Sequence, residues 1–254
     1  MLQTALKAAV ASGRIIRKYY RKDCGIYKKG DYDLVTDADY ESEKKAMEII
    51  SYDFPDHSFL CEECGFSGHN DSEYKWLIDA LDGTINFSRR IPLFSVSIAL
   101  LKNEVPTLSV IYNPITEDLY YSEKGKGSYL NDKKIIISNK NELNNSIAVT
   151  DLTKDRHYHE EFFKTISSLS KDLLGIRLTQ STSINLAFVA EGKYDIFIKN
   201  KINYYDLIAG TLMCEEAGGT AIDFSGNNIS KSSKGIIVSN NLLAMKILER
   251  IQLK

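Results

Sequence analysis

The chain has 254 residues, of which 43% are hydrophobic and 26% are charged, so it can form a large core in one domain or in two smaller ones. Its 32 basic and 34 acidic side chains give a net charge of −2, which provides no overall field to attract nucleic acid or an anionic membrane. We therefore expect any charge-dependent function to rest on a local cluster of residues.

The N-terminal region predicts two helices. Residues 2–21 place apolar and basic side chains at helical spacing, and residues 38–51 continue with a second helical pattern that opens in the acidic segment TDADYESEKK. The first pattern lacks the long apolar run of a signal peptide or a membrane helix, so we expect a cytoplasmic protein. The polar, glycine-containing segment CGIYKKGDYD between the helices predicts a mobile loop.

The rest of the first half predicts a largely antiparallel sheet. Short strands are expected at 58–61 and 75–79, on either side of a polar insert. Three further apolar runs, LFSVSIALL, TLSVIYNP and EDLYYSEKG, are separated by turn sequences and predict successive antiparallel strands. The polar run ISNKNELNNS at 137–146 then marks the expected boundary between one half, 1–140, and another, 141–254.

The second half alternates short strands with helices. Strands are expected in SIAVT, GIRLT, YDIFIK, GTAIDF and GIIVS, and helices at 157–170, 182–190, 205–217 and from 241 onward. This alternation is typical of an α/β unit whose sheet is covered on both faces. The sequence thus predicts an α+β half followed by an α/β half.

The cysteines offer one candidate site. Four cysteines in 254 residues are too few for a disulfide framework, but Cys61 and Cys64 form a C-x-x-C that could be half of a zinc site or a redox pair. No second pair of thiol or imidazole ligands accompanies them, and the two residues between them are glutamates, which disfavour a thiolate. Two small, partly buried side chains are the simpler interpretation.

A more specific pattern is DALDGTIN at 79–86, where two aspartates follow an apolar run. A carboxylate at the end of a buried strand is costly unless a positive charge compensates it, and Mg²⁺ with oxygen ligands is a suitable partner. Gly83 allows a sharp turn, after which Thr84 and Ile85 would offer free N–H groups at a helix start. Cations beside an anion site suit phosphate ester hydrolysis, although the spacing alone also fits a plain strand-to-turn connection.

Four motifs occur in order across nearly the whole chain: DLVTDAD, CEE, WLIDALDGTINF and YYDLIAGTLMCEEAGG. Together, and in this order, they resemble the inositol monophosphatase family of Mg²⁺-dependent, lithium-sensitive phosphatases. The segment STSINLAFVAEGKYDIF is also similar to the family's helix-strand unit before the last metal ligand. The resemblance implies a layered αβαβα sandwich, often a homodimer, that hydrolyses a small sugar or polyol phosphate such as inositol monophosphate.

The resemblance also implies roles for individual residues and two or three Mg²⁺ per site. Glu62, Asp79 and the Leu81 carbonyl would bind the first ion, while Asp79 would bridge to a second held by Asp82 and Asp206. Thr84, hydrogen-bonded to Asp39, would orient and help deprotonate the attacking water, and Glu62 is the third catalytic residue expected. Phosphate would contact the N–H groups of Gly83, Thr84 and Ile85. The remaining substrate-binding candidates are Asp82, Arg177, Ser181, Thr182, Lys199 and Asp206.

One departure from the family bears on the substrate. Lys199 stands where inositol-specific members carry a glutamate, and a lysine cannot accept hydrogen bonds from inositol hydroxyls. It could instead bind a second phosphate, with Lys201 and Arg177 as candidates to help, and the sequence resembles archaeal and bacterial relatives that hydrolyse fructose 1,6-bisphosphate as well as inositol phosphates. A solvated surface lysine is the alternative. Gln180 also replaces a usual glycine. Histidinol phosphate, NADP, a 3′-phosphonucleotide and a catalytically silent phosphometabolite-binding regulator remain open, although Ile85-Asn86-Phe87 disfavours the nucleotide.

Overall fold

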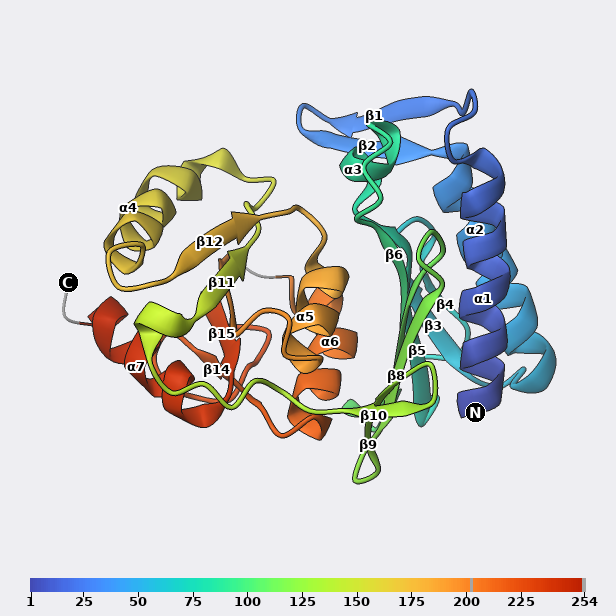
Figure 1. Ribbon diagram of the computed structural model, residues 1–254. Helices are drawn as coiled ribbons and strands as arrows, with labels where there is room; N and C mark the ends of the chain where they lie inside the picture. The colour runs from blue at the N-terminus through green and yellow to red at the C-terminus, as the bar shows by residue number, and fades with distance from the viewer. Residues whose placement is uncertain (202, 253–254) are drawn as a thin grey trace.

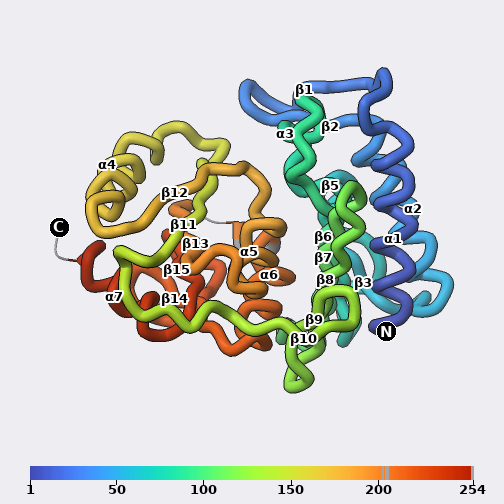
Figure 2. The backbone as a smooth tube through the Cα atoms, in the orientation of Figure 1, coloured from blue at the N-terminus to red at the C-terminus, as the bar shows by residue number. Residues whose placement is uncertain are grey.

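Five layers follow one another across the molecule, in the order helix, sheet, helix, sheet, helix (Figure 1). The computed structural model describes residues 1–201 and 203–252. The expected αβαβα sandwich is confirmed. Figure 2 follows the chain from the outer helices through the large sheet to the smaller second sheet.

The first layer consists of α1 (Leu2–Tyr19) and α2 (Asp37–Asp53), close to the predicted ranges. Helix α1 buries small side chains, including Ala5, Ala8 and Ala9, which lie on one helical face and let it pack closely against α2 and the sheet. Helix α2 begins after Thr36 because this residue and Asp39 form a capping box, each side chain satisfying the other's backbone N–H.

The second layer is an eight-stranded sheet with the order β10-β9-β8-β7-β6-β5-β3-β4. Only the β3–β5 pair is parallel among its described pairings, so the prediction of a largely antiparallel first half is confirmed. The strands are β3 (Ser58–Cys61), β4 (Gly65–Ser67), β5 (Tyr74–Asp82), β6 (Ser95–Lys102), β7 (Val105–Asn113), β8 (Asp118–Glu123), β9 (Gly127–Leu130) and β10 (Lys133–Ile135).

The segment predicted to be a mobile loop is instead an antiparallel hairpin of β1 (Ile26–Gly30) and β2 (Asp33–Thr36). It projects from the edge of the sandwich near the short helix α3 (Thr84–Ser88) (Figure 1). All five residues of β1 are exposed, so this strand carries no alternation of buried and exposed residues from which to predict it. Strands β4, β9 and β10 were also absent from the prediction, because they are short and their sequences, GFS, GSYL and KKI, contain glycine or polar residues and no apolar run.

The central layer contains α5 (Thr182–Ala190) and α6 (Tyr204–Glu216), which lie between the two sheets. Eight of the nine residues of α5 are buried, as expected for a helix covered on both sides. One core cluster accordingly spans both sheets: it includes Leu77 of the large sheet, Leu186 of α5 and Phe197 of the small sheet.

The small sheet has the order β12-β11-β13-β15-β14 and confirms the predicted strand-helix alternation. Its first three members pair in parallel, whereas β15 pairs antiparallel with both β13 and β14. The strands are β11 (Ile147–Thr150), β12 (Gly175–Leu178), β13 (Ile196–Asn200), β14 (Thr220–Asp223) and β15 (Gly235–Ser239). Helices α4 (His159–Leu169) and α7 (Asn241–Gln252) form the last layer.

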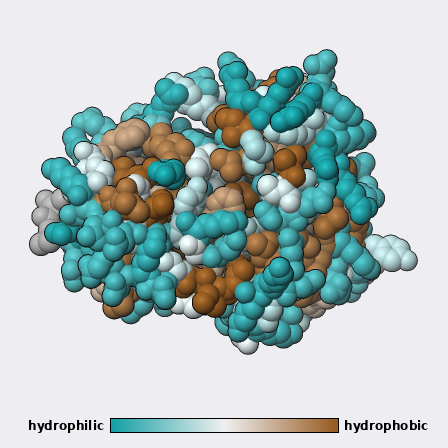
Figure 3. Space-filling view, in the orientation of Figure 1, coloured by the Kyte–Doolittle hydropathy of each residue, from teal (hydrophilic) through white to brown (hydrophobic). Residues whose placement is uncertain are grey.

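The chain passes from one sheet to the other between Ile135 and Ile147, and the predicted boundary at residue 140 falls in this interval. One core cluster spans both sheets, and the division into halves 1–140 and 141–254 stays a prediction. On the face shown in Figure 3, apolar residues form separate patches among hydrophilic ones. No helix in the described part of the chain is both long and apolar enough to cross a membrane.

Candidate metal and phosphate site

Most of the predicted site residues line one cavity of about 460 Å³, although they are up to about 140 positions apart in the sequence. Both halves contribute to its lining. The predicted residues that line it are Glu62, Asp79, Leu81, Asp82, Gly83, Thr84, Ile85, Thr182, Lys199 and Asp206. Asp39, Arg177 and Ser181 are the predicted residues outside this lining.

A bulge at the end of β5 places both aspartates of the DALD motif on the same side of the sheet. Asp79 pairs with Ser97 of β6 and Asp82 pairs with Ser95, so three steps along β5 oppose two along β6. Without this extra residue, positions three apart would face opposite sides. Ala80 and Leu81 both pack into the core beneath α1 and α2, which leaves the two carboxylates facing the cavity.

The carboxylates of the cavity repel one another. Loss of solvation and the nearby charges of Glu62, Asp82 and Asp206 raise the pKa of Asp79 well above its usual value. Asp206, in the first turn of α6, remains accessible to the cavity, but the walls remove it from bulk water; this and the charge of Glu62 raise its pKa to about 7. A cluster of oxygen ligands with excess negative charge fits hard cations such as Mg²⁺.

Asp82 is held by the start of α5. Its carboxylate accepts hydrogen bonds from the Ser181 hydroxyl at 2.6 Å, the Ser183 N–H at 2.9 Å and the Thr182 N–H at 3.2 Å. Desolvation raises the pKa of Asp82 to about 6, although the Ser181 bond opposes the shift. The carboxylate therefore joins β5 of the first half to α5 of the second.

Ser181 and Thr182 were predicted to bind substrate, which stays a prediction, and their hydroxyls make other contacts in the structure. The Ser181 hydroxyl is directed to Asp82, so the structure places it behind a metal-ligand candidate and not on the cavity surface. The Thr182 hydroxyl donates to buried Asp151 at 3.0 Å and accepts from Lys199 at 3.0 Å. Asp151 itself was not predicted, but it follows strand β11 directly, the same position that drew attention to the other carboxylates.

Thr84 contacts Asp39 as the sequence motifs imply. The Thr84 hydroxyl lies 3.1 Å from Oδ1 of Asp39 and 3.1 Å from the carbonyl oxygen of Leu81. Oδ2 of Asp39 accepts from the N–H and hydroxyl of Thr36, at 2.8 and 2.6 Å, which leaves Oδ1 toward Thr84. Burial raises the pKa of Asp39 to about 7, although the bonds from Thr36 and Thr84 oppose it.

Gly83 occupies the turn between β5 and α3 with φ of 94°, in the left-handed region. A β-carbon there would lie 2.8 Å from the carbonyl oxygen of Leu93. Both facts explain why glycine occurs at this point of the motif. The participation of Gly83, Thr84 and Ile85 in phosphate binding stays a prediction.

Three lysines also line the cavity. Lys154 Nζ lies 2.6 Å from Oδ1 of Asp33 and 3.5 Å from Oε1 of Glu62. Lys199 belongs to β13, and Lys201 comes directly after this strand. The Asp33 bond and the acidic charges raise the pKa of Lys154, although desolvation opposes them. Lys154 was not predicted, since it lies in a polar loop with no motif. Arg177 lies on edge strand β12, exposed and away from the cavity lining.

The β1–β2 hairpin borders the cavity, because Asp33 and Leu34 belong to the lining. Its Lys29 pairs with Glu63, next to the metal-ligand candidate Glu62. The hairpin therefore lies at the edge of the candidate site.

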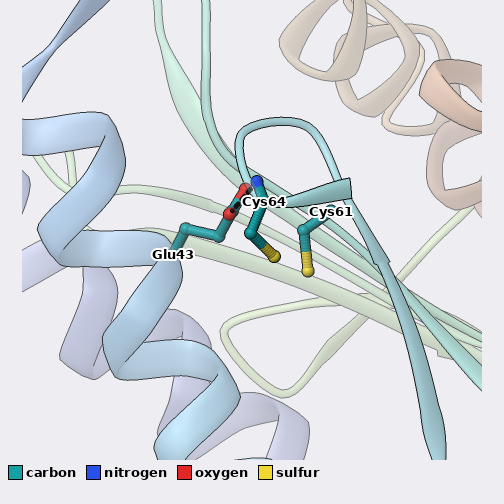
Figure 4. Close-up of side chains that lie close together, drawn as sticks. All are labelled: Glu43, Cys61 and Cys64. Carbon is teal, nitrogen blue, oxygen red and sulfur yellow. Dashed lines mark hydrogen bonds between the residues drawn. The ribbon is translucent and has the colours of Figure 1, made fainter. Parts of the chain in front are cut away.

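The C-x-x-C motif acquires a third neighbour in the fold. One carboxylate oxygen of Glu43 and the sulfur atoms of Cys61 and Cys64 lie within 4.8 Å of one another (Figure 4). Burial raises the pKa of both thiols, and the charge of Glu43 acts in the same direction. These conditions disfavour a thiolate, while the zinc and redox hypotheses themselves stay untested.

Comparisons with known proteins agree with this geometry. The model of the inositol monophosphatase family matches residues 1–253. Inositol-1-monophosphatase of Caulobacter vibrioides is 36% identical, with 99% of both chains covered. Nus factor SuhB of Pasteurella multocida is 33% identical and covers 99% of this chain and 96% of its own. The crystal structure of extragenic suppressor protein suhB from Bartonella henselae superposes with a TM-score of 0.95 at 31% identity, covering 98% of this chain and 97% of the other. The chain therefore belongs to the inositol monophosphatase family.

Proposed function

We propose that the protein is a Mg²⁺-dependent phosphatase that hydrolyses the phosphate monoester of a small sugar or polyol. The main support is the convergence of Glu62, Asp79, Asp82 and Asp206 in one cavity, next to the hydrogen-bonded pair Thr84 and Asp39. Membership of the family agrees with a phosphatase. A homodimer is expected from the same resemblance, and a cytoplasmic protein from the helical pattern of residues 2–21.

The carboxylates would hold two or three Mg²⁺. Glu62, Asp79 and the Leu81 carbonyl are suited to one ion, and Asp79, Asp82 and Asp206 to another, since all of them reach the same cavity. When bound, Mg²⁺ neutralises charge on the phosphate and makes a coordinated water more acidic. Burial and the charges of neighbouring carboxylates raise the pKa of Asp79, Asp82 and Asp206, and a bound cation would offset both effects.

Thr84 and Asp39 would handle the proton of the attacking water. Thr84 Oγ1 would accept a hydrogen bond from the water while it donates to Oδ1 of Asp39, whose other oxygen is already fixed by Thr36. As the water loses a proton to Thr84 Oγ1, Asp39 Oδ1 would receive the proton of Thr84. A pKa of about 7 suits Asp39 to this exchange near neutral pH.

The lysines support a substrate with a second anionic group. Lys199 lines the cavity and donates to the Thr182 hydroxyl there, which favours a role in binding over that of a solvated surface lysine. We propose that Lys199, with Lys201 beside it, favours a sugar bisphosphate such as fructose 1,6-bisphosphate over inositol monophosphate. Arg177 is not supported as a partner, because its side chain is exposed on β12 and donates to the carbonyl of Ile176.

Gln180 fits this altered wall of the pocket. Its φ of 62° is the left-handed conformation that glycine adopts most easily, which agrees with its place at a usual glycine position. Hydrogen bonds offset this cost: its N–H donates to Asp151 at 2.7 Å and its side-chain oxygen accepts from Leu152 at 2.8 Å. The Gln180 side chain therefore lines the cavity in a fixed position.

Other activities are the alternatives to this proposal. Histidinol phosphate, NADP and 3′-phosphonucleotides carry the same phosphate monoester and would be recognised through the rest of the molecule. A regulatory, non-catalytic role is a further alternative, since Pasteurella multocida SuhB carries the name Nus factor. The complete set of carboxylates around the cavity favours catalysis, because a binding module would not need it.

The test is phosphate release from a panel of esters that includes inositol monophosphate, fructose 1,6-bisphosphate, histidinol phosphate, NADP and a 3′-phosphonucleotide. We expect release with Mg²⁺, none with EDTA and none for Asp82→Asn. Asp71→Asn serves as the matched control, because Asp71 is exposed and distant from the cavity lining. Mg²⁺ binding without release from any ester would favour a regulator, and activity unaffected by EDTA would refute the metal-dependent mechanism.

A further inference from the structure

Glu43 of α2 is a buried carboxylate that contacts the loop next to the cavity without lining it. Its side chain is only 3% exposed and faces the turn between β3 and β4 (Figure 4). Oε2 accepts a hydrogen bond from the N–H of Glu63 at 2.9 Å, and Oε1 accepts one from the N–H of Cys64 at 2.9 Å. Both carboxylate oxygens are thus directed at successive backbone donors.

The turn that Glu43 binds carries the metal-ligand candidate Glu62. Cys61 at the end of β3 pairs with Gly65 at the start of β4, so residues 62–64 form the tip of the hairpin. The N–H of Glu62 donates to the carbonyl of Ile78 on β5 at 3.1 Å. The three successive N–H groups of the tip therefore have fixed partners, two of which are the oxygens of Glu43.

A carboxylate suits this place better than an amide. Two adjacent N–H donors converge on Glu43, and a carboxylate offers two acceptor oxygens and no donor. A glutamine would direct its NH₂ at one of the two N–H groups and leave that donor without a partner in a buried site. The negative charge of the Glu43 carboxylate also strengthens both bonds, because a hydrogen bond from a backbone N–H to an ionised acceptor is stronger than one to a neutral acceptor.

We propose that Glu43 is a positioning residue, whose two hydrogen bonds fix the hairpin tip and thereby the place at which Glu62 presents its carboxylate to a cation. The inference rests on the proposed function of Glu62. Glu43 itself would contact neither the cation nor the substrate. Residues that orient metal ligands in this way typically change metal affinity by about 10- to 100-fold when replaced.

The neighbouring sulfur atoms do not require a different role for Glu43. Cys64 Sγ contacts the sulfur of Met47 at 3.5 Å, and Cys61 is buried in the core beneath α1 and α2. A metal held by Glu43, Cys61 and Cys64 together would make the thiols as important as the carboxylate. Positioning through the backbone would make them dispensable, so a Cys64→Ser variant separates the two.

The experiment is calorimetric titration of the metal-free full chain with Mg²⁺, combined with thermal unfolding. For Glu43→Gln we expect at least about 10-fold weaker binding at the tightest site, with kcat largely recovered at high Mg²⁺. Ser42→Ala is the matched control: Ser42 is fully buried on the same helix and its hydroxyl donates within α2 to Ala38. Ser42→Ala should lower the Tm but leave the Mg²⁺ affinity unchanged. Cys64→Ser should also leave the Mg²⁺ affinity unchanged.

A double-mutant cycle adds a stricter test. If Glu43 acts through Glu62, Glu43→Gln in a Glu62→Gln background should weaken Mg²⁺ binding no further. Additive losses would overturn the proposal, and so would unchanged affinity in Glu43→Gln or an equal loss in Cys64→Ser. Should Glu43→Gln fail to fold, Glu43→Asp, which keeps the charge on a shorter side chain, must show the weakening instead. Because calorimetry needs no turnover, wild-type protein that binds Mg²⁺ but hydrolyses no ester would refute the proposed function and still test Glu43.

Discussion

The hydroxyl of Thr84 lies at the same distance, 3.1 Å, from Oδ1 of Asp39 and from the Leu81 carbonyl, and it has one proton for the two acceptors. When Asp39 is ionised, the stronger bond is to the carboxylate, and the Leu81 carbonyl is left for another partner. The protonation of Asp39 therefore determines both the direction of the Thr84 hydroxyl and the availability of a metal-ligand candidate.

The first prediction concerns Thr84. Replacement by valine keeps the shape but removes the hydroxyl, and we expect kcat to fall about 100-fold or more because water loses its proton acceptor. Thr84→Ser, which retains the hydroxyl, should keep most of the activity. Steady-state phosphate release at saturating Mg²⁺ measures both. Equal activities of the valine and serine variants would show that the hydroxyl is not used.

The second prediction concerns Asp39 and pH. Its folded pKa of about 7 is above the ordinary value of 3.8, so the folded protein binds a proton that the unfolded chain releases between these values. Stability from this group is full below about pH 4 and is lost as the pH rises through about 7. In EDTA, Asp39→Asn should show a smaller fall in Tm than wild type between about pH 5 and about pH 8. Parallel Tm curves would contradict the pKa shift.

The third prediction is that Mg²⁺ binding releases protons. In the metal-free protein the pKa of Asp206 is about 7 and that of Asp82 about 6, so a fraction of these groups is protonated near pH 6. A cation needs the ionised forms, and its affinity should therefore fall as the pH decreases from about 8 to about 5.5. Calorimetry in two buffers of different ionisation enthalpy measures the released protons. Binding heats independent of the buffer would contradict this.

A fourth prediction addresses substrate choice. Lys199→Glu should lower the ratio of fructose 1,6-bisphosphate to inositol monophosphate turnover, because it removes a cation and adds an acceptor for hydroxyl groups. Lys193→Glu is a suitable control: Lys193 pairs with Glu191 and lies outside the cavity lining. An unchanged ratio in Lys199→Glu would remove the support for a second anion site.

The fifth prediction concerns the support of Asp82. Ser181→Ala removes its 2.6 Å hydrogen bond, and a bond to a charged group contributes about 1.5–3 kcal/mol. We expect weaker Mg²⁺ binding and a higher pKa for Asp82, which together shift the pH profile of activity upward. Ser181→Thr should retain the bond and the wild-type profile. A loss of kcat with an unchanged profile would instead indicate that Ser181 acts on the substrate.

The carboxylates of the site could be predicted from sequence because each stands next to an apolar strand or at a helix start, where an acidic side chain is conspicuous. Asp79, Asp82 and Asp206 all belong to this class, and the cavity contains all three. The order of strand and helix in the second half was equally readable, since elements such as α5 and β15 are buried along nearly their whole length and rich in apolar residues.

Other features depend on tertiary contacts that leave no local pattern. The bulge between Asp79 and Asp82 is defined only by pairing with β6, and the β1–β2 hairpin has a fully exposed first strand. Lys154 reaches the cavity from a loop, whereas Arg177, on a regular strand, remains outside. Periodicity tells which residues share a face of one element, but not which elements meet.

The carboxylate of Asp82, held by the start of α5, lies between the half with the large sheet and the half with the small sheet. The other candidate oxygen ligands come from both halves. Cations bound there would hold the two halves together. Partial opening of the molecule along this seam would have to break their coordination first, so occupancy should slow local unfolding and attack by proteases. The candidate metal ligands would then affect the lifetime of the folded protein as well as its catalysis.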